Sequence, residues 1–223
     1  MIDFTPDTKL NESQIHDLFS SEDDAVFCDI GARTGEFSIP RAKLCKKVYA
    51  FEPSSFNFPN LKKSSAQFGD RYECFNVAFS DKDYDCVTRF KDCTTDQSEQ
   101  KIKYRQIRSF FIEHDLDTPT YVKIDVEGME STILKTMNFL FEKRVPIYCE
   151  VHHISDTWDC MDYKDNPSFK KPKDGGFDFN ILKEYEYKVY QHIRTHDSST
   201  MRFITKDQDY NPPDPSHWGM LLV

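Results

Sequence analysis

The feature that most constrains the fold is a regular alternation of short apolar segments with segments of helical periodicity. Strand-like segments lie at residues 25–30, 47–51, 71–78, 121–126 and 146–152, and helical ones lie at residues 11–19, 36–45, 56–68, 109–114 and 129–143. Short apolar runs are typical of strands that are buried on both faces, as in a parallel sheet covered by its crossover helices. The order of the segments therefore predicts an α/β fold, with a mostly parallel sheet and helices on both faces.

The chain changes character after residue 153. Residues 155–176 contain Pro, Lys, Asp and a Gly-Gly pair, which favours an irregular surface segment. A helix is expected at residues 178–184, and strands at 187–194 and 218–223 are expected to form an antiparallel pair. A length of 223 residues fits a single domain, with residues 1–24 as an N-terminal helical extension. Residues 155–176 are a candidate lid, whose aromatic side chains are suited to stacking on sugar rings.

The charge balance disfavours several classes of protein. Asp and Glu number 38 against 29 Lys and Arg, and the net charge of −9 repels phosphate backbones and anionic membrane surfaces. No apolar run approaches the roughly 20 residues of a membrane span. Seven cysteines at irregular spacings, without a C-x-x-C pair, favour a reducing compartment. We therefore expect a cytoplasmic protein that binds neither nucleic acid nor membrane, whose oligomeric state the sequence does not indicate.

A glycine-containing turn follows the first predicted strand. Residues 29–35 read DIGARTG, in which Gly31 permits a tight turn close to a ligand and Gly35 permits a helix to begin near the strand. The second strand ends in Phe-Glu-Pro at residues 51–53, which places the carboxylate of Glu52 where it can accept hydrogen bonds from both hydroxyls of a ribose. The two motifs together predict an adenosine-containing cofactor.

The spacing of the turn separates two cofactor classes. In the dinucleotide fingerprint G-x-G-x-x-G the middle glycine lets a pyrophosphate approach the backbone, and here Arg33 occupies that position. Acidic residues gather at the predicted site, which suits a ligand with a sulfonium and an ammonium group; these are Asp29, Glu36, Glu52 and Asp125. S-adenosylmethionine is therefore the favoured cofactor. The alternatives are an NAD-dependent oxidoreductase and a catalytically silent binding module of the same fold.

Four segments of the sequence carry a resemblance to a known family. They are VFCDIGARTG at residues 26–35, AFEP at 50–53, NVAFSD at 76–81 and VKIDVEGME at 122–130. Together they resemble the FkbM family of S-adenosylmethionine-dependent methyltransferases. The resemblance implies a Rossmann-like class I methyltransferase fold with a seven-stranded sheet and a reversed final strand, and O-methylation of a sugar, glycan or related small molecule. The residues expected to bind the cofactor are Asp29, Gly31, Ala32, Arg33, Gly35, Glu52, Pro53, Asn76, Ala78 and Asp125.

The candidate catalytic residues follow the fourth and fifth predicted strands, because ligands of open α/β sheets bind at the carboxyl ends of the strands. An alcohol is barely ionised at neutral pH, so its attack on a methyl group requires a positioned base. His152, which shares a strand face with Glu150, is the predicted base, and His153 is expected to point away. Asp125, Glu127 and Glu150 complete the predicted catalytic group. No metal is predicted, although Asp125, Glu150 and a histidine form an alternative site for a divalent cation.

One further segment has basic residues at alternating positions. Residues 101–108 read KIKYRQIR, which is typical of a half-buried strand with a solvated basic face. The functional alternative is a binding edge for an anionic acceptor.

Overall fold

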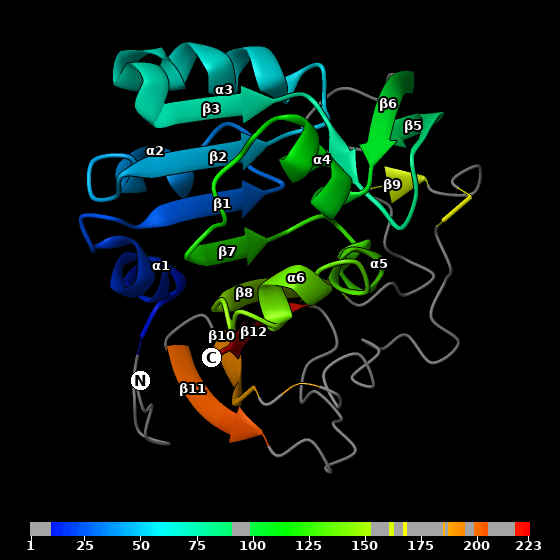
Figure 1. Ribbon diagram of the computed structural model, residues 1–223. Helices are drawn as coiled ribbons and strands as arrows, with labels where there is room; N and C mark the ends of the chain where they lie inside the picture. The colour runs from blue at the N-terminus through cyan, green and yellow to red at the C-terminus, as the bar shows by residue number, and fades with distance from the viewer. Residues whose placement is uncertain are drawn as a thin grey trace.

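The computed structural model describes residues 10–90, 99–152, 161–162, 167–168, 185, 187–194, 199–204 and 217–223. Its main sheet has the strand order β11-β10-β12-β8-β7-β1-β2-β3 (Figure 1). The strands are β1 (Val26–Ile30), β2 (Lys47–Phe51), β3 (Tyr72–Phe75), β7 (Tyr121–Ile124), β8 (Ile147–His152), β10 (Val189–Arg194), β11 (Ser199–Ile204) and β12 (His217–Leu222). Strands β3, β2, β1, β7 and β8 are parallel neighbours, and β12 pairs antiparallel with both β8 and β10.

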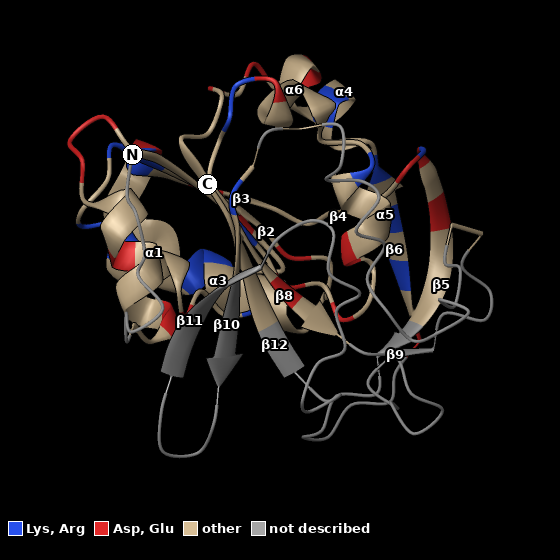
Figure 2. Ribbon diagram, turned by 90° about the horizontal axis from the view of Figure 1, so that it is seen from below, with Lys and Arg blue, Asp and Glu red and all other residues tan. Residues whose placement is uncertain are grey.

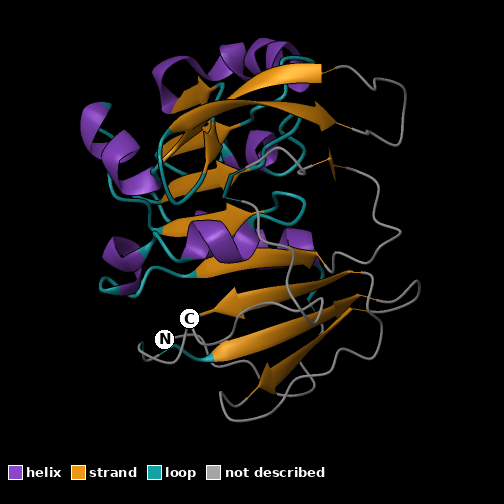
Figure 3. Ribbon diagram, turned by 90° about the vertical axis from the view of Figure 1, so that its right-hand side faces the viewer, coloured by secondary structure: helices purple, strands orange, loops and turns teal. Residues whose placement is uncertain are grey.

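This topology confirms the predicted α/β class and the reversed final strand. Seven strands lie where the sequence predicts them, and β12 is the reversed strand inserted between β8 and β10. Strand β11 was not predicted, and it adds an eighth strand beside β10 at one end of the sheet (Figure 3). Among the described residues, no helix is long and apolar enough to cross a membrane.

Helices cover both faces of the sheet. One face packs against α1 (Glu12–Ser20), α2 (Ser38–Arg41) and α3 (Asn57–Ser65), and the other packs against α4 (Ile107–Glu113), α5 (Glu130–Leu134) and α6 (Asn138–Phe141). A short 3-10 helix, η1 (Ala66–Arg71), follows α3. Helix α1 begins at a capping box, because Asn11 accepts from the backbone of Gln14 and the Gln14 side chain accepts from the backbone of Asn11.

Two predicted helices are shorter than expected. The predicted helix at 129–143 is divided into α5 and α6, because the Thr136 hydroxyl and backbone N–H both donate to the carbonyl of Ile133 and close the helix with a tight turn. The predicted helix at 36–45 is reduced to α2, which contains Pro40 and so lacks one backbone donor. The predicted helix at 178–184, His153, Cys93, Cys160 and most of the candidate lid at 155–176 lie outside the described residues.

A second, smaller sheet lies beyond the carboxyl ends of the main strands. It contains β4 (Ala78–Phe79), β5 (Tyr84–Phe90), β6 (Glu99–Arg105) and β9 (Met161–Asp162) in the order β4-β6-β5-β9 (Figure 1). The expected strand at 71–78 is therefore divided between β3 and β4, which belong to different sheets. Strand β6 has alternating exposed and buried residues, which confirms the half-buried strand expected at residues 101–108 as far as Arg105. Ile107 and Arg108 belong to α4 instead. The lysines of β6 form a basic stripe (Figure 2).

Candidate active site

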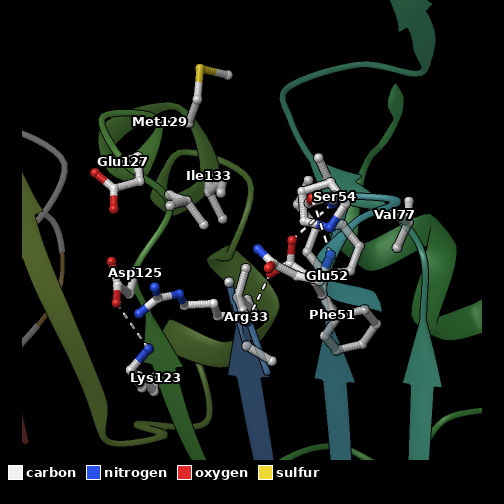
Figure 4. Close-up of a pocket in the computed structure, with 18 of the residues that line it drawn as sticks. Arg33, Phe51, Glu52, Ser54, Val77, Lys123, Asp125, Glu127, Met129 and Ile133 are labelled. Atoms are coloured by element: carbon white, nitrogen blue, oxygen red, sulfur yellow. Dashed lines mark hydrogen bonds and ion pairs between the residues drawn. The ribbon is translucent and has the colours of Figure 1, made fainter. Parts of the chain in front are cut away.

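The described residues form a cavity of about 300 Å³ at the carboxyl ends of β1, β2 and β7, closed on one side by the small sheet. Figure 4 shows Glu52 on one side of this cavity and Asp125 and Glu127 on the other. Of the residues expected to bind the cofactor, seven line it, and these are Gly31, Ala32, Arg33, Glu52, Pro53, Ala78 and Asp125. Asp29, Gly35 and Asn76 do not line it.

The turn after β1 packs directly against the end of β7. Gly31 has a φ of 84°, and a Cβ atom at this position would lie 1.7 Å from the backbone oxygen of Asp125. The backbone N–H groups of Gly31 and Ala32 donate to the carbonyl of Phe51 at 2.9 and 3.0 Å. Glycine is therefore required at residue 31 both by the left-handed backbone and by the close approach of the two strand ends.

Glu52 is a buried carboxylate at the cavity wall, with an exposed fraction of 5%. Its Oε2 accepts from the backbone N–H of Arg33 at 2.7 Å and its Oε1 accepts from that of Ser54 at 2.8 Å. Burial raises the pKa of Glu52 to about 7, against the lowering effect of these hydrogen bonds. Asn76 donates to the carbonyls of Glu52 and Pro53 at 2.9 and 3.0 Å, so it supports the position of Glu52 from behind.

A buried lysine lies at the base of the cavity. Lys123 Nζ is 3.5 Å from Asp29 Oδ1 and 3.3 Å from Asp125 Oδ2, and it lies 4.9 Å from the centre of the Phe37 ring. Burial by itself lowers the pKa of Lys123, but Asp125 and Asp29 outweigh it and raise the pKa above its ordinary value. Asp29 was expected to contact the cofactor, but it is fully buried and its carboxylate faces Lys123 instead.

Four carboxylates surround the imidazole of His152, in a group that we call the acid–histidine cluster: Asp125, Glu127, Glu130, Glu150 and His152. His152 Nδ1 lies 2.7 Å from Glu130 Oε1. His152 Nε2 lies 3.6 Å from Glu127 Oε2, 3.7 Å from Asp125 Oδ1 and 3.9 Å from Glu150 Oε1. The cluster therefore joins the ends of β7 and β8 to the start of α5.

The arrangement of the cluster does not support His152 as the base. Burial lowers its pKa, but Glu130, Glu127 and Asp125 outweigh burial and raise the pKa to about 10, so the ring is protonated at neutral pH. Its side chain is 2% exposed and does not line the cavity. Glu150 is also buried behind the wall, whereas Asp125 and Glu127 reach the cavity. The alternation of residues along β8 could not reveal this, because the carboxylates that raise the pKa, Glu130, Glu127 and Asp125, lie outside β8.

Glu127 is the most exposed of the four carboxylates in the cluster, with 42% of its side chain accessible. Its backbone has a φ of 55°, a left-handed conformation that is costly for a residue other than glycine. Arg33, on the turn after β1, also lines the cavity with a φ of 51°. Burial raises the pKa of Glu127 to about 7, although the charge of His152 acts in the opposite direction. Strained backbone therefore occurs at two points of the cavity wall.

Sequence reasoning missed several residues of the site. Lys123 and Glu130 lay within residues 122–130, one of the segments that resemble the FkbM family. The alternation along β7 also indicated that Lys123 shares a face with Asp125. Gln100 and Tyr104 reach the cavity from β6. No sequence signal indicated Gln100, whereas Tyr104 lay within residues 101–108, which were considered as a binding edge for their basic residues. Gln100 Oε1 accepts from the backbone and the hydroxyl of Ser55 at 2.7 and 2.9 Å, which joins the small sheet to the segment after β2.

The sequence also matches the family model described as the methyltransferase FkbM domain, over residues 29–189. The chain belongs to this family. The matched region includes the turn after β1, Glu52, Lys123 and the acid–histidine cluster. This FkbM-family chain is thus a methyltransferase whose methyl donor is S-adenosylmethionine.

Solved structures show the same fold at low sequence identity. An O-methyltransferase from Bacillus cereus in complex with SAH has a TM-score of 0.51 and 10% identity, over 95% of this chain and 79% of that chain. A proposed rRNA methylase from Clostridium thermocellum has a TM-score of 0.52 and 11% identity, over 96% of this chain and 97% of that chain. A ribosomal protein L11 methylase from Lactobacillus delbrueckii subsp. bulgaricus has a TM-score of 0.50 and 10% identity, over 95% and 76%. No curated protein matches the chain.

The chemistry of the cavity fits S-adenosylmethionine. Each oxygen of Glu52 already accepts one backbone hydrogen bond and retains lone pairs suited to the hydroxyls of a ribose. Apolar side chains beside it suit a flat base, and these include Phe51, Val77 and Phe79. The carboxylate of Asp125, on the other side, suits the positive charge of the methionine part of the cofactor.

Proposed function

We propose that the chain transfers a methyl group from S-adenosylmethionine to a hydroxyl of a sugar, a glycan or a related small molecule, inside the cell. The observation that carries this proposal is the division of the cavity between Glu52, suited to a ribose, and a carboxylate pair on the other side, Asp125 and Glu127. An alcohol is barely ionised at neutral pH, so a hydroxyl acceptor requires a positioned proton acceptor during attack.

The contacts support the binding roles that we propose. Glu52 accepts hydrogen bonds from the two ribose hydroxyls, while the turn at Gly31 and Ala32 forms the wall beside it. The cation of Lys123 balances Asp29 and holds Asp125 toward the cavity. Because transfer from a sulfonium is an in-line displacement, the main task of these residues is to fix the donor relative to the acceptor oxygen.

When bound, S-adenosylmethionine supplies a methyl group whose bond to sulfur breaks as the new carbon–oxygen bond forms, leaving a neutral thioether. Glu127 accepts the hydroxyl proton, because it is a half-buried carboxylate that reaches the cavity wall. Glu127 takes the role of base that was predicted for His152, because the His152 side chain is buried within the cluster and does not line the cavity. Asp125, adjacent to Glu127 in the cluster, orients the acceptor hydroxyl. The products are a methyl ether, S-adenosylhomocysteine and a proton.

The charge of the chain supports a small acceptor over a nucleic acid. With 38 acidic against 29 basic residues, the chain lacks the positive excess that neutralises phosphates in nucleic-acid complexes. The five described cysteines are free thiols, in agreement with a reducing compartment; they are Cys28, Cys45, Cys74, Cys86 and Cys149.

The experiment is to incubate the full chain with S-adenosylmethionine and a panel of sugars, glycan fragments and hydroxylated small molecules, and to quantify S-adenosylhomocysteine. Methyl ether formation, identified by NMR, would support the proposal. Glu127→Gln is expected to lower turnover about 10²–10⁴-fold while cofactor affinity stays within about threefold. Methylation confined to an RNA or protein acceptor in parallel reactions would refute the proposed acceptor class.

A further inference from the structure

The acid–histidine cluster contains three side chains with the arrangement of a metal site. One ligand atom each from Asp125, Glu150 and His152 lies within 4.8 Å of the other two. Strands β7 and β8 are parallel neighbours with Ile124 opposite Cys149, so Asp125 and Glu150 are adjacent at the strand ends. Glu150 and His152 are two residues apart on β8 and therefore share a face. The main sheet thus builds this group from two neighbouring strands.

The orientation of His152 is a second observation that points to a ligand. Glu130 lies 2.7 Å from Nδ1, so the other nitrogen, Nε2, is directed at the carboxylates. Histidines that bind metals typically donate their second ring N–H to a carboxylate, which fixes both the tautomer and the ring orientation. The imidazole of His152 is almost completely buried, with 2% of its side chain exposed. Glu130 therefore orients the buried imidazole so that Nε2 faces Asp125 and Glu150.

The distances from His152 Nε2 to the carboxylates of Asp125 and Glu150 are longer than those of hydrogen bonds. Nε2 lies 3.7 Å from Asp125 Oδ1 and 3.9 Å from Glu150 Oε1, beyond the range in which an N–H donates effectively. Adjacent ligands of an octahedral Mg²⁺ or Mn²⁺ lie about 3 Å apart, so a shift of about 1 Å would complete the geometry. Two carboxylates and one imidazole suit divalent cations that accept oxygen and nitrogen ligands.

We propose that Asp125, Glu150 and His152 bind a divalent cation of the Mg²⁺ and Mn²⁺ class, with Glu130 orienting His152. The cation takes the place of the proton on Nε2, because a metal-bound imidazole is neutral. Asp125 also lines the cavity, so the cation lies beside the acceptor position. Its chemical role rests on the proposed function: it lowers the pKa of the acceptor hydroxyl, and Glu127 receives the proton.

The test is titration of the purified full chain with MnCl₂ in metal-free buffer, with free Mn²⁺ measured by electron paramagnetic resonance. We expect one Mn²⁺ per chain. Glu150→Gln is expected to weaken binding at least about 100-fold, and Glu130→Gln about 10–100-fold, the usual effect of losing an outer partner. The matched control is Glu73→Gln, which removes a carboxylate on β3 at the other end of the sheet and is expected to leave Mn²⁺ affinity unchanged.

Circular dichroism of each variant establishes that it is folded before titration. Absence of stoichiometric binding to the folded wild-type chain up to about 1 mM Mn²⁺ would overturn the proposal, and so would equal affinities of wild type and Glu150→Gln. The cluster would then be an ion-pair network. Loss of methyl transfer with EDTA, restored by Mg²⁺, is a further expected result. Mn²⁺ binding is measured without cofactor or acceptor, so failure of the proposed acceptor class would leave this result intact.

Discussion

At the scale of single residues, burial of charged groups decides most of the chemistry of the site. Glu52 keeps a carboxylate in an almost closed environment with two backbone donors, and Lys123 keeps a cation between two carboxylates. Such groups are expensive to bury without partners. Substitutions at these two residues therefore separate binding effects from stability effects.

Glu52 predicts a pH dependence of cofactor binding. Its pKa of about 7 means that the carboxylate is half protonated at neutral pH and loses its acceptor capacity as the pH falls. We expect affinity for S-adenosylmethionine to rise about tenfold from pH 6 to pH 8. Glu52→Gln should weaken binding at pH 8 by about 1.5–3 kcal/mol and remove this component of the pH dependence. Isothermal titration calorimetry measures both, and a wild-type pH profile in the variant would exclude Glu52 from the ribose site.

The same raised pKa has the opposite effect on stability. In the unfolded chain the Glu52 carboxyl ionises near pH 4.5, so between about pH 4.5 and 7 the folded state holds more protons than the unfolded one. The contribution of Glu52 to the free energy of unfolding is therefore greatest below pH 4.5 and declines as the pH rises to 7. Comparison of wild type with Glu52→Gln by urea unfolding across this range isolates it.

Lys123 predicts a large loss of stability. Lys123→Met leaves Asp29 and Asp125 without their buried cation, and we expect the free energy of unfolding to fall by about 3–5 kcal/mol. The double variant Lys123→Met/Asp29→Asn should recover part of this loss. Urea unfolding followed by circular dichroism provides the measurement, and the exposed Lys46→Met is the control, expected to change stability by less than about 0.5 kcal/mol. A loss below about 1 kcal/mol for Lys123→Met would contradict the assigned role.

At the scale of elements, the site depends on two close approaches. The turn after β1 touches the end of β7 at Gly31, and β6 of the small sheet contacts the segment after β2 through Gln100 and Ser55. The first approach sets the width of the cavity between Glu52 and Asp125. The second closes the cavity on the side of the small sheet.

Gly31→Ala tests the first approach. The added Cβ would overlap the backbone oxygen of Asp125, so the turn must move, and we expect binding of S-adenosylmethionine to weaken at least about 30-fold, or 2 kcal/mol. Gly69→Ala is the matched control, because Gly69 also has a positive φ but no heavy atom lies near its Cβ position. The control should lose only about 1 kcal/mol of stability and keep its cofactor affinity. Equal affinities of the two variants would show that the strand-end contact does not shape the site.

At the scale of the whole molecule, the parallel core brings carboxylates from distant segments to one end of the sheet. The strands were predictable because buried apolar runs such as Val26–Ile30 have few alternatives to a central strand. The places of Gly31 and Glu52 on the cavity wall were predictable because each belongs to a short motif at the end of a strand. The protonation of His152 was not predictable, because it depends on Glu130, Glu127 and Asp125, which lie outside β8. The part of the cavity wall formed by Gln100 was not predictable either. The break at Thr136 was missed because periodicity continues through it.

The overall charge predicts weak binding to nucleic acids. A net charge of −9 repels phosphates, and the basic stripe of β6 is short. We expect a dissociation constant weaker than about 10⁻⁴ M for a 30-nucleotide RNA at 150 mM salt, measured by fluorescence anisotropy. Lys101→Gln should change nothing under these conditions. Micromolar binding that falls steeply with salt would contradict this expectation and favour an RNA acceptor.

The pairing of β12 with β8 has a consequence for the newly made chain. Strand β8 carries Glu150 and His152. Its neighbour β12 begins at His217, which is 65 residues after the end of β8 at His152. At a synthesis rate of about 5–20 residues per second, the ribosome needs roughly 3–13 s to supply that neighbour. During this interval the nascent β8 has an unpaired edge. The strand that bears the cluster therefore reaches its final environment late in translation, after the turn at Gly31 and Glu52 have already been synthesised.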